Sequence, residues 1–210
     1  MTRRYDAVLF DLLTALVDSW SLWNAVAGSA EAGVRWRAAY LRRTYATGAY
    51  RPYETLVAEA AAEVGLAPRL ADELAERYAE LRPWPGVVEE LATLAAAGIK
   101  LGVATNCSGE LGRVAADCVG VAFDVLVTAE RAGFYKPDPA PYRLALDELG
   151  VAPERCLFVA GSAYDLVGAS RVGVDIWWHD RIGMAKPPEA SAPLRHTSDF
   201  AGLAGFVLAV

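Results

Sequence analysis

Strand-like and helix-like segments alternate along the second half of this chain. The segments 99–105, 123–128, 156–161 and 174–178 are apolar runs of strand length, and helical patterns are expected over 86–97, 108–117, 138–149 and 165–172. Strands separated by helices form a mainly parallel sheet with right-handed crossovers and helices on both faces. The sequence therefore predicts an α/β fold.

An earlier apolar run, Ala7 to Phe10, has the residue types of a buried parallel strand and ends at Asp11. In an open α/β sheet, groups at the carboxyl ends of the strands line the ligand crevice. A carboxylate at this position is costly to bury unless it has a chemical task. The alternative is an aspartate that caps the following helix.

The segment between about Ser21 and Arg82 is helical in pattern and shows no convincing strand. Breaks at Gly28-Ser29, Thr47-Gly48, Arg51-Pro52 and Gly65 to Pro68 divide it into three or four helices. We therefore expect a helical insertion over 17–83 and an α/β core built from 1–16 and 84–210. The tail after Arg181 is expected to wrap the surface before a short helix from about Ser198.

Composition restricts the class of partner. The 210 residues are 54% hydrophobic and 22% charged, with a net charge of −6 and no basic run, which argues against nucleic acid and anionic membranes and favours a small-molecule substrate. No apolar run approaches the ~20 residues of a membrane span, and no signal peptide precedes the first strand, so we expect a cytoplasmic protein. The three cysteines share no metal-ligand spacing, and the chain has only two histidines.

Polar residues follow each of the predicted core strands. They are Asp11, Thr105 with Asn106, Lys136, and Ser162 with Asp165. Each alone has an ordinary explanation, since Thr105 or Ser162 can cap a helix and Lys136 can be solvated. Because the carboxyl ends of parallel strands meet at one edge of a sheet, we interpret the set as one functional crevice.

Four short motifs carry a family resemblance. They are Phe10-Asp11, Ala104-Thr105-Asn106, Tyr135-Lys136-Pro137-Asp138-Pro139 and Gly161-Ser162-Ala163-Tyr164-Asp165, and in this order they resemble the haloacid dehalogenase superfamily. The resemblance implies a Rossmann-like core with a helical cap domain. It also implies that Asp11 is the nucleophile, Thr105 a hydrogen-bond donor, Lys136 a charge anchor, and Asp165 an acid that positions Lys136 or water.

At two positions the chain lacks acidic residues that the phosphatases of this superfamily use, one as a general acid and one to bind magnesium. Phosphatases of the superfamily have a general-acid aspartate two residues after the nucleophile and a magnesium-binding acid opening the fourth motif, where this chain has Leu13 and Gly161. Neither residue can donate a proton or an oxygen ligand. Phosphatase chemistry is therefore disfavoured, and no metal or cofactor is expected.

The remaining features resemble the 2-haloacid dehalogenase branch. Trp36-Arg37, followed by Leu41 and Thr44, is similar to its substrate-carboxylate segment, and the spacing from Lys136 to Tyr142 matches its lysine-tyrosine pair. A guanidinium grips a carboxylate at two points and fixes its orientation. The alternative for Arg37 is a solvated helix face, because Arg35, Arg42 and Arg43 are nearby.

Other positions differ from the residues typical of that branch, so the sequence does not determine the identity of the leaving group. Leu13, Thr14 and Ala15 replace an aromatic residue, a glycine and a threonine, and Ala160, Gly161 and Ser162 replace serines and an asparagine. A related activity opens the ring of azetidine-2-carboxylate. Trp20, Trp23 and Asn24 could contact such a substrate, or the tryptophans could be core aromatics.

The resemblance implies covalent catalysis in two steps. Asp11 would attack a saturated carbon of a 2-substituted carboxylic acid held by Arg37, and water would hydrolyse the resulting ester. Thr105, Asn106 and the amides near Leu12 would stabilise the charge that develops, and Asp165 with Ser162 would position the water. A non-catalytic binding protein that kept the fold is the competing class. The sequence does not determine the oligomeric state, and a homodimer is among the states it allows.

Overall fold

A six-stranded parallel sheet forms the centre of the molecule. The computed structural model describes residues 3–209. The strands are β1 (Ala7–Phe10), β2 (Lys100–Thr105), β3 (Val125–Thr128), β4 (Cys156–Ala160), β5 (Asp175–His179) and β6 (Arg195–Thr197). They lie in the order β3-β2-β1-β4-β5-β6, and every neighbouring pair is parallel. The predicted α/β fold class is confirmed.

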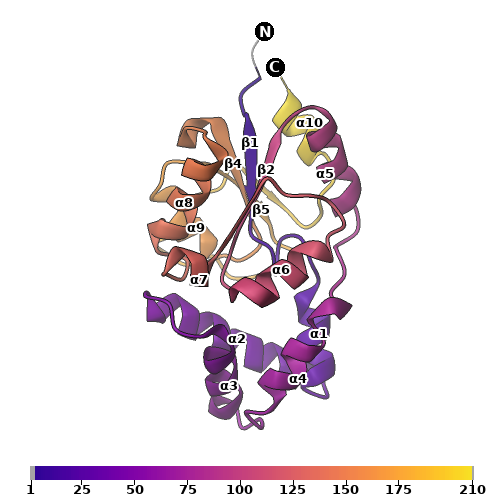
Figure 1. The fold of residues 1–210 in the computed structure, drawn as a ribbon, viewed down its shortest axis with the longest axis vertical. Coiled ribbons are helices and arrows are strands. Elements are labelled where there is room, and N and C mark those ends of the chain that lie inside the picture. Colours follow the sequence, from indigo (N-terminus) through magenta and orange to yellow (C-terminus); the bar gives the residue numbers. More distant parts are fainter. Residues whose placement is uncertain (1–2, 210) are drawn as a thin grey trace.

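The sheet is buried on both faces, which explains the continuous apolar runs in its strands. Val8 and Phe10 of β1 pack into one hydrophobic cluster, and Ala7 and Leu9 pack into another on the opposite face. Helices α5 (Val87–Ala96), α6 (Gly109–Asp117) and α10 (Leu203–Leu208) contribute to the first cluster, and α8 (Pro139–Leu149) and α9 (Asp165–Ser170) to the second. Figure 1 shows α5 and α10 on one side of the strands and α8 and α9 on the other.

The strand order reverses direction at β1. From β1 the chain proceeds through β2 to β3 on one side of the sheet, and later through β4 and β5 to β6 on the other. Crossovers therefore diverge on either side of β1 and open a crevice at its carboxyl end, where ligands bind in open α/β sheets. Asp11 lies at this point, and its backbone N–H extends the sheet by donating to Val159 O at 3.0 Å.

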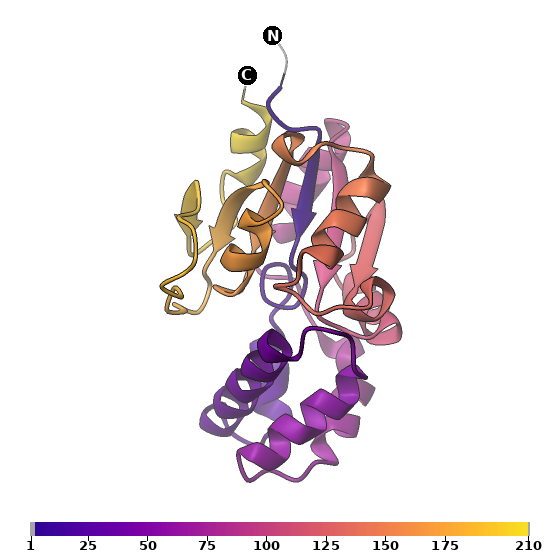
Figure 2. The ribbon, with the colours of Figure 1, turned by 90° about the vertical axis from the view of Figure 1, so that its left-hand side faces the viewer.

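Four α-helices lie across the carboxyl ends of the strands (Figures 1 and 2). They are α1 (Ser19–Val26), α2 (Ala30–Thr47), α3 (Tyr53–Glu63) and α4 (Leu70–Glu76), followed by a 3-10 turn at Tyr78–Glu80. A β-bridge between Val17 and Pro83 pairs the two ends of this helical insertion, and a second one between Ala49 and Phe134 joins the insertion to the core. The Tyr40 hydroxyl also donates to Asn106 O at 2.7 Å, so the insertion is attached directly beside the crevice.

The structure differs from the sequence prediction mainly in short elements. The tail contains β6, whereas we expected only surface loop, and α10 begins at Leu203 and not near Ser198. Strand β6 is a three-residue polar edge strand, and its sequence lacks the apolar pattern by which strands are recognised. The four-residue helix α7 (Ala129–Ala132) was also not predicted, and α1 begins two residues before Ser21.

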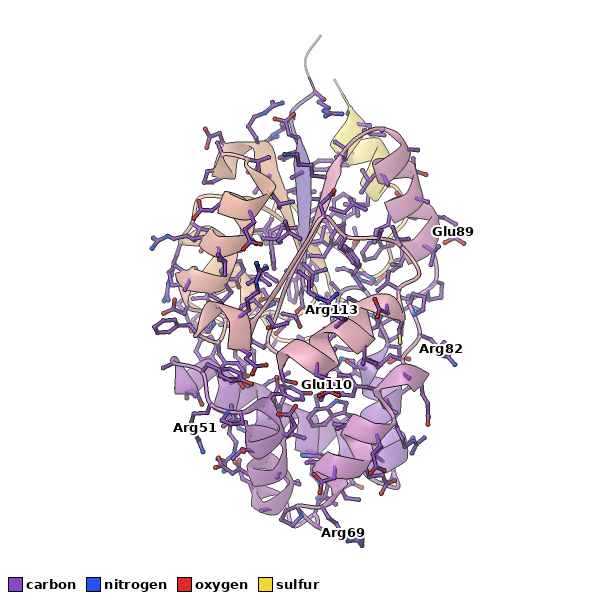
Figure 3. All side chains as sticks on the ribbon, viewed as in Figure 1. Arg51, Arg69, Arg82, Glu89, Glu110 and Arg113 are labelled. Carbon is purple, nitrogen blue, oxygen red and sulfur yellow. The ribbon has the colours of Figure 1, made fainter. Side chains whose placement is uncertain are left out.

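Charged side chains are mostly on the surface. Arg69 at the tip of the insertion and Glu89 on α5 point away from the ribbon in Figure 3. Among the helices of residues 3–209, none combines the length and hydrophobicity that crossing a membrane requires. Four buried charged groups gather instead near the carboxyl end of β1, namely Asp11, Arg37, Lys136 and Asp165.

Candidate active site

Two carboxylates share one ammonium at the end of β1. Lys136 Nζ lies 2.8 Å from Asp11 Oδ1 and 2.9 Å from Asp165 Oδ1, and all three side chains are buried. Tyr142 on α8 donates its hydroxyl to Asp165 Oδ1 at 3.0 Å. The structure therefore brings together three of the predicted catalytic residues, from three segments far apart in the sequence.

This arrangement shifts the pKa values of two groups. Burial raises the pKa of Asp165 to about 6, and the nearby negative charge of Asp11 adds to this, although Lys136 opposes it. Burial disfavours a charged Lys136, but its ion pairs with Asp11 and Asp165 outweigh this effect and raise the pKa of the ammonium. Lys136 therefore stays protonated, and Asp165 is able to exchange a proton near neutral pH.

The second oxygen of Asp11 contacts the loop that follows β1. Asp11 Oδ2 accepts hydrogen bonds from the backbone N–H groups of Thr14 at 3.2 Å and Ala15 at 3.3 Å. The sequence predicts that amides near Leu12 stabilise the charge that develops at Asp11. In the structure the amides that contact this carboxylate belong to Thr14 and Ala15, two and three residues further along the chain. Two N–H donors directed at one carboxyl oxygen form a small oxyanion-binding site.

Gly161 allows that loop to lie where it does. A Cβ atom at Gly161 would lie 2.1 Å from Ala15 N and 2.5 Å from Thr14 C. Any larger residue would push the loop, and with it the two amide donors, away from Asp11. The glycine is therefore a packing requirement of this site and cannot be exchanged for an acid without rebuilding the loop.

Thr105 and Asn106 complete the wall next to Asp11. The Thr105 side chain is fully buried, and its hydroxyl has no hydrogen-bond partner within the described part of the chain, so it is free to donate to a bound group. Asn106 is already engaged, because its amide donates to Lys136 O at 3.0 Å and accepts from Lys136 N at 2.7 Å. Asn106 thus positions Lys136.

Arg37 of α2 reaches the same site from the helical insertion. Its side chain is only 1% exposed, so the alternative of a solvated helix face is wrong. Nη2 donates to Leu13 O at 3.3 Å and to Thr14 Oγ1 at 3.1 Å. Its Nε and Nη1 are buried and have no partner among residues 3–209. A buried guanidinium with free donors is a suitable receptor for a carboxylate.

These groups line one pocket between the sheet and the insertion. Asp11, Arg37, Thr105, Asn106, Lys136, Ser162 and Asp165 contribute to its wall. Ser162 comes from the loop after β4, and its hydroxyl accepts from Tyr164 N at 3.3 Å. The enclosed space is small, so the pocket suits a ligand of only a few heavy atoms.

Four other predicted site residues lie in the layer behind this wall. Leu12 is in the hydrophobic core, and the Tyr142 hydroxyl donates a hydrogen bond to Asp165. The Trp20 ring packs under Arg37, with the guanidinium carbon 4.8 Å from the ring centroid. Asn24 packs on α2, where a Cβ at Gly33 would lie 2.3 Å from its Oδ1. Tyr142 thus supports Asp165 and Trp20 supports Arg37, while Leu12 and Asn24 belong to the surrounding packing.

Several wall residues were not assigned a role from the sequence. Thr14, Tyr40 and Tyr45 line the pocket together with Leu41, which the sequence analysis had quoted only as part of a motif. Residues 37, 41, 44 and 45 share one face of α2 because side chains three or four apart are neighbours on a helix. Extending that spacing from Arg37 could have identified Tyr45.

The site does not fit the magnesium ion that phosphatases of this fold require. One oxygen of each carboxylate, Asp11 Oδ1 and Asp165 Oδ1, is already paired with the Lys136 ammonium. Gly161 has no side-chain ligand and no room for one. Within residues 3–209, no group of three or more histidine, cysteine, aspartate or glutamate side chains is placed so that it could hold a metal ion.

Comparisons with known proteins agree with this geometry. The model of the haloacid dehalogenase-like hydrolase family matches residues 5–173. (S)-2-haloacid dehalogenase H-109 of Pseudomonas putida is 29% identical over 219 residues, covering 97% of this chain and 98% of the relative. The structure of L-2-haloacid dehalogenase from Xanthobacter autotrophicus has a TM-score of 0.85 and 25% identity, covering 97% of this chain and 98% of that chain.

A phosphatase is also among the relatives. Phosphoserine phosphatase of Thermus thermophilus is 38% identical over 149 residues, covering 68% of this chain and 60% of the relative. The match to the family model spans most of the chain, so this protein belongs to the haloacid dehalogenase-like hydrolases. It is an enzyme with close similarity in sequence and structure to 2-haloacid dehalogenases, which favours the enzyme over the non-catalytic alternative.

Proposed function

We propose that this enzyme hydrolyses a small 2-substituted carboxylic acid, with a 2-haloacid as the favoured substrate. One observation carries the proposal: the buried carboxylate of Asp11, paired with Lys136, opens on the same pocket as the buried guanidinium of Arg37. A nucleophile and a carboxylate receptor therefore face one small ligand. This combination suits attack at the carbon next to a carboxylate.

In the first step, Arg37 binds the substrate carboxylate and orients the neighbouring carbon toward Asp11. An oxygen of Asp11 forms a bond to this carbon, and the halide leaves with the electron pair of the broken bond. The Lys136 ammonium stabilises the negative charge of Asp11 in a site from which water is largely excluded. The product of this step is an ester on Asp11.

In the second step, water attacks the ester carbonyl of Asp11. The amides of Thr14 and Ala15 stabilise the negative charge that develops on the carbonyl oxygen. Asp165 Oδ2 is buried without a partner within residues 3–209 and lines the pocket with Ser162, so these two residues are placed to orient the water and accept its proton. The ester C–O bond then breaks, which releases the 2-hydroxy acid and leaves an oxygen from water on Asp11.

The identity of the leaving group is inferred from the relatives of this chain and not from the geometry of the pocket. The relatives named as 2-haloacid dehalogenases support a halide. Opening of azetidine-2-carboxylate would use the same nucleophile and the same carboxylate receptor, with a ring nitrogen as the leaving group. Trp20 and Asn24, which suggested that alternative, are not among the residues that line the pocket, so halide hydrolysis is the better supported reaction.

The experiment combines a substrate series with isotope labelling. Purified enzyme is supplied with (S)-2-chloropropanoate, azetidine-2-carboxylate and a phosphate monoester with magnesium, and release of chloride, ring-opened amine and phosphate is measured. Multiple turnovers in heavy-oxygen water are then followed by mass spectrometry of the peptide that contains Asp11. We expect chloride release and heavy oxygen on Asp11.

The matched control is Asp11→Asn, which removes the nucleophile and nearly preserves its shape. It should be inactive when freshly purified and should keep the melting temperature close to that of wild type. Heavy oxygen found only in the product acid would mean that water attacks the substrate directly, against the ester. Phosphate release without chloride release would overturn the proposed substrate class.

A further inference from the structure

A pair of tyrosines from different parts of the chain closes one end of the pocket. Tyr45 lies in the last turn of α2, and Tyr164 lies in the loop between β4 and α9. Their ring centroids are 4.7 Å apart with the planes tilted by 44°, and both rings line the pocket. Both side chains are only partly buried, so the pair stands at the boundary between the pocket and solvent.

A third segment holds Tyr45 in this position. The Tyr45 hydroxyl donates to Glu189 Oε1 at 3.1 Å, and Glu189 belongs to the long connection between β5 and β6. Burial, together with this hydrogen bond, raises the pKa of the Tyr45 hydroxyl, so the phenol remains a donor at neutral pH. The helical insertion, the loop after β4 and the tail of the core therefore meet at a single side chain.

The inner face of α2 connects this pair to Arg37. Positions 37, 41 and 45 follow each other at intervals of one turn, and the rise of about 1.5 Å per residue places Tyr45 roughly 12 Å along the helix axis from Arg37. Leu41 lies between them, and Leu13 of the core also lines the pocket. The wall thus changes from a charged group to aliphatic groups and ends at an aromatic pair.

We infer that the Tyr45–Tyr164 pair limits the chain length of the substrate, and that Glu189 is a positioning residue for Tyr45. The inference rests on the proposed function, in which Arg37 binds the carboxylate and Asp11 attacks the adjacent carbon. The alkyl group of the substrate then extends along Leu41 toward the two rings. Short 2-substituted acids fit in front of the pair, whereas longer ones collide with it.

The test measures how catalytic efficiency depends on the chain length of the substrate. Values of kcat/KM are determined for (S)-2-chloropropanoate, 2-chlorobutanoate and 2-chlorohexanoate with wild type and Tyr45→Ala. We expect wild type to lose efficiency as the chain lengthens. Tyr45→Ala should raise the ratio of 2-chlorohexanoate to 2-chloropropanoate efficiency by roughly tenfold or more, since a single methylene in an apolar pocket changes discrimination by about that factor.

Three further variants separate the causes. Tyr45→Phe and Glu189→Ala each remove the hydrogen bond and keep a ring, so both should shift the same ratio in the same direction and by a smaller factor than Tyr45→Ala. Arg42→Ala breaks an exposed ion pair with Glu63 at 3.0 Å on the outer side of α2 and should leave the profile unchanged. If Tyr45→Ala does not fold, Tyr45→Leu provides the shorter side chain.

The outcomes distinguish this inference from the proposed function. An active wild type whose profile is the same in Tyr45→Ala, or is shifted equally by Arg42→Ala, overturns the inference alone. A wild type that hydrolyses none of the chloroacids overturns the proposed function. In that case the inference is judged by calorimetric binding of propanoate, butanoate and hexanoate, where Tyr45→Ala must gain affinity for hexanoate selectively or the inference fails.

Discussion

Replacing Arg37 by lysine tests the proposed carboxylate receptor, because lysine keeps the charge and removes the two-point geometry. In the structure, Nη2 holds Leu13 O and Thr14 Oγ1, while the free Nε and Nη1 remain for a ligand. A lysine ammonium is a single point charge on a flexible stem and cannot serve both groups of acceptors. The reacting carbon would then no longer be held in line with Asp11.

The expected loss of efficiency follows from one hydrogen bond. Losing a charge-assisted hydrogen bond to the substrate costs about 1.5–3 kcal/mol, which lowers kcat/KM roughly ten- to a hundredfold. Nη2 of Arg37 also makes two charge-assisted bonds to the loop, and a lysine that keeps one of them would cost the fold about 1.5–3 kcal/mol. This cost corresponds to a melting temperature lower by roughly 3–12 °C in a protein of this size. The variant should therefore remain folded at the assay temperature while its kcat/KM falls.

The assay is steady-state chloride release from (S)-2-chloropropanoate, paired with thermal melting. Arg35→Lys is the matched control, because Arg35 lies on the exposed side of the same helix, with its Nη1 3.7 Å from Glu31 Oε1. This control should change neither kcat/KM nor the melting temperature. Unchanged efficiency in Arg37→Lys would refute the assignment of Arg37 as the receptor. A collapse of the melting temperature together with efficiency would make Arg37 a structural residue.

Three further predictions address metal, pH and packing. Activity should survive exhaustive chelation because Leu13 and Gly161 supply no oxygen ligand beside Asp11, and loss with EDTA that magnesium restores would contradict this. Burial raises the pKa of Asp165 from 3.8 to about 6 in the folded protein, so its contribution to stability is present below about pH 4 and is lost as the pH rises through 6. The melting temperature of wild type should therefore fall relative to that of Asp165→Asn between pH 4 and pH 6. Parallel curves of melting temperature against pH would refute the raised pKa. Gly161→Ala should destabilise the protein by about 1–3 kcal/mol and abolish activity by displacing Ala15, whereas Gly205→Ala, which places its Cβ in open space, should do neither.

Much of the fold could be predicted from the sequence because its signals are local. The apolar runs that form β1 to β5 are buried on both faces and stand out as continuous hydrophobic segments. Asp11 interrupts such a run, and parallel strands bring their carboxyl ends to one edge of the sheet. Strand β6 could not be predicted, since its three polar residues are ordered by pairing with β5 and not by their own hydrophobicity.

The sequence by itself determined which residues could do the chemistry, because a carboxylate, an ammonium and a guanidinium have their properties wherever they lie. Only the tertiary structure decided which of them meet. Lys136 Nζ lies 2.8 Å from Asp11 Oδ1 across 125 residues of chain. Arg37 is enclosed between the core loop and Trp20, although Arg35 and Arg42 on the same helix are exposed. Tyr45 shares a helix face with Arg37, but only the packing of α2 against the loop after β4 makes that face part of the pocket. Which elements pack together depends on the tertiary fold, and helix spacing alone does not encode it.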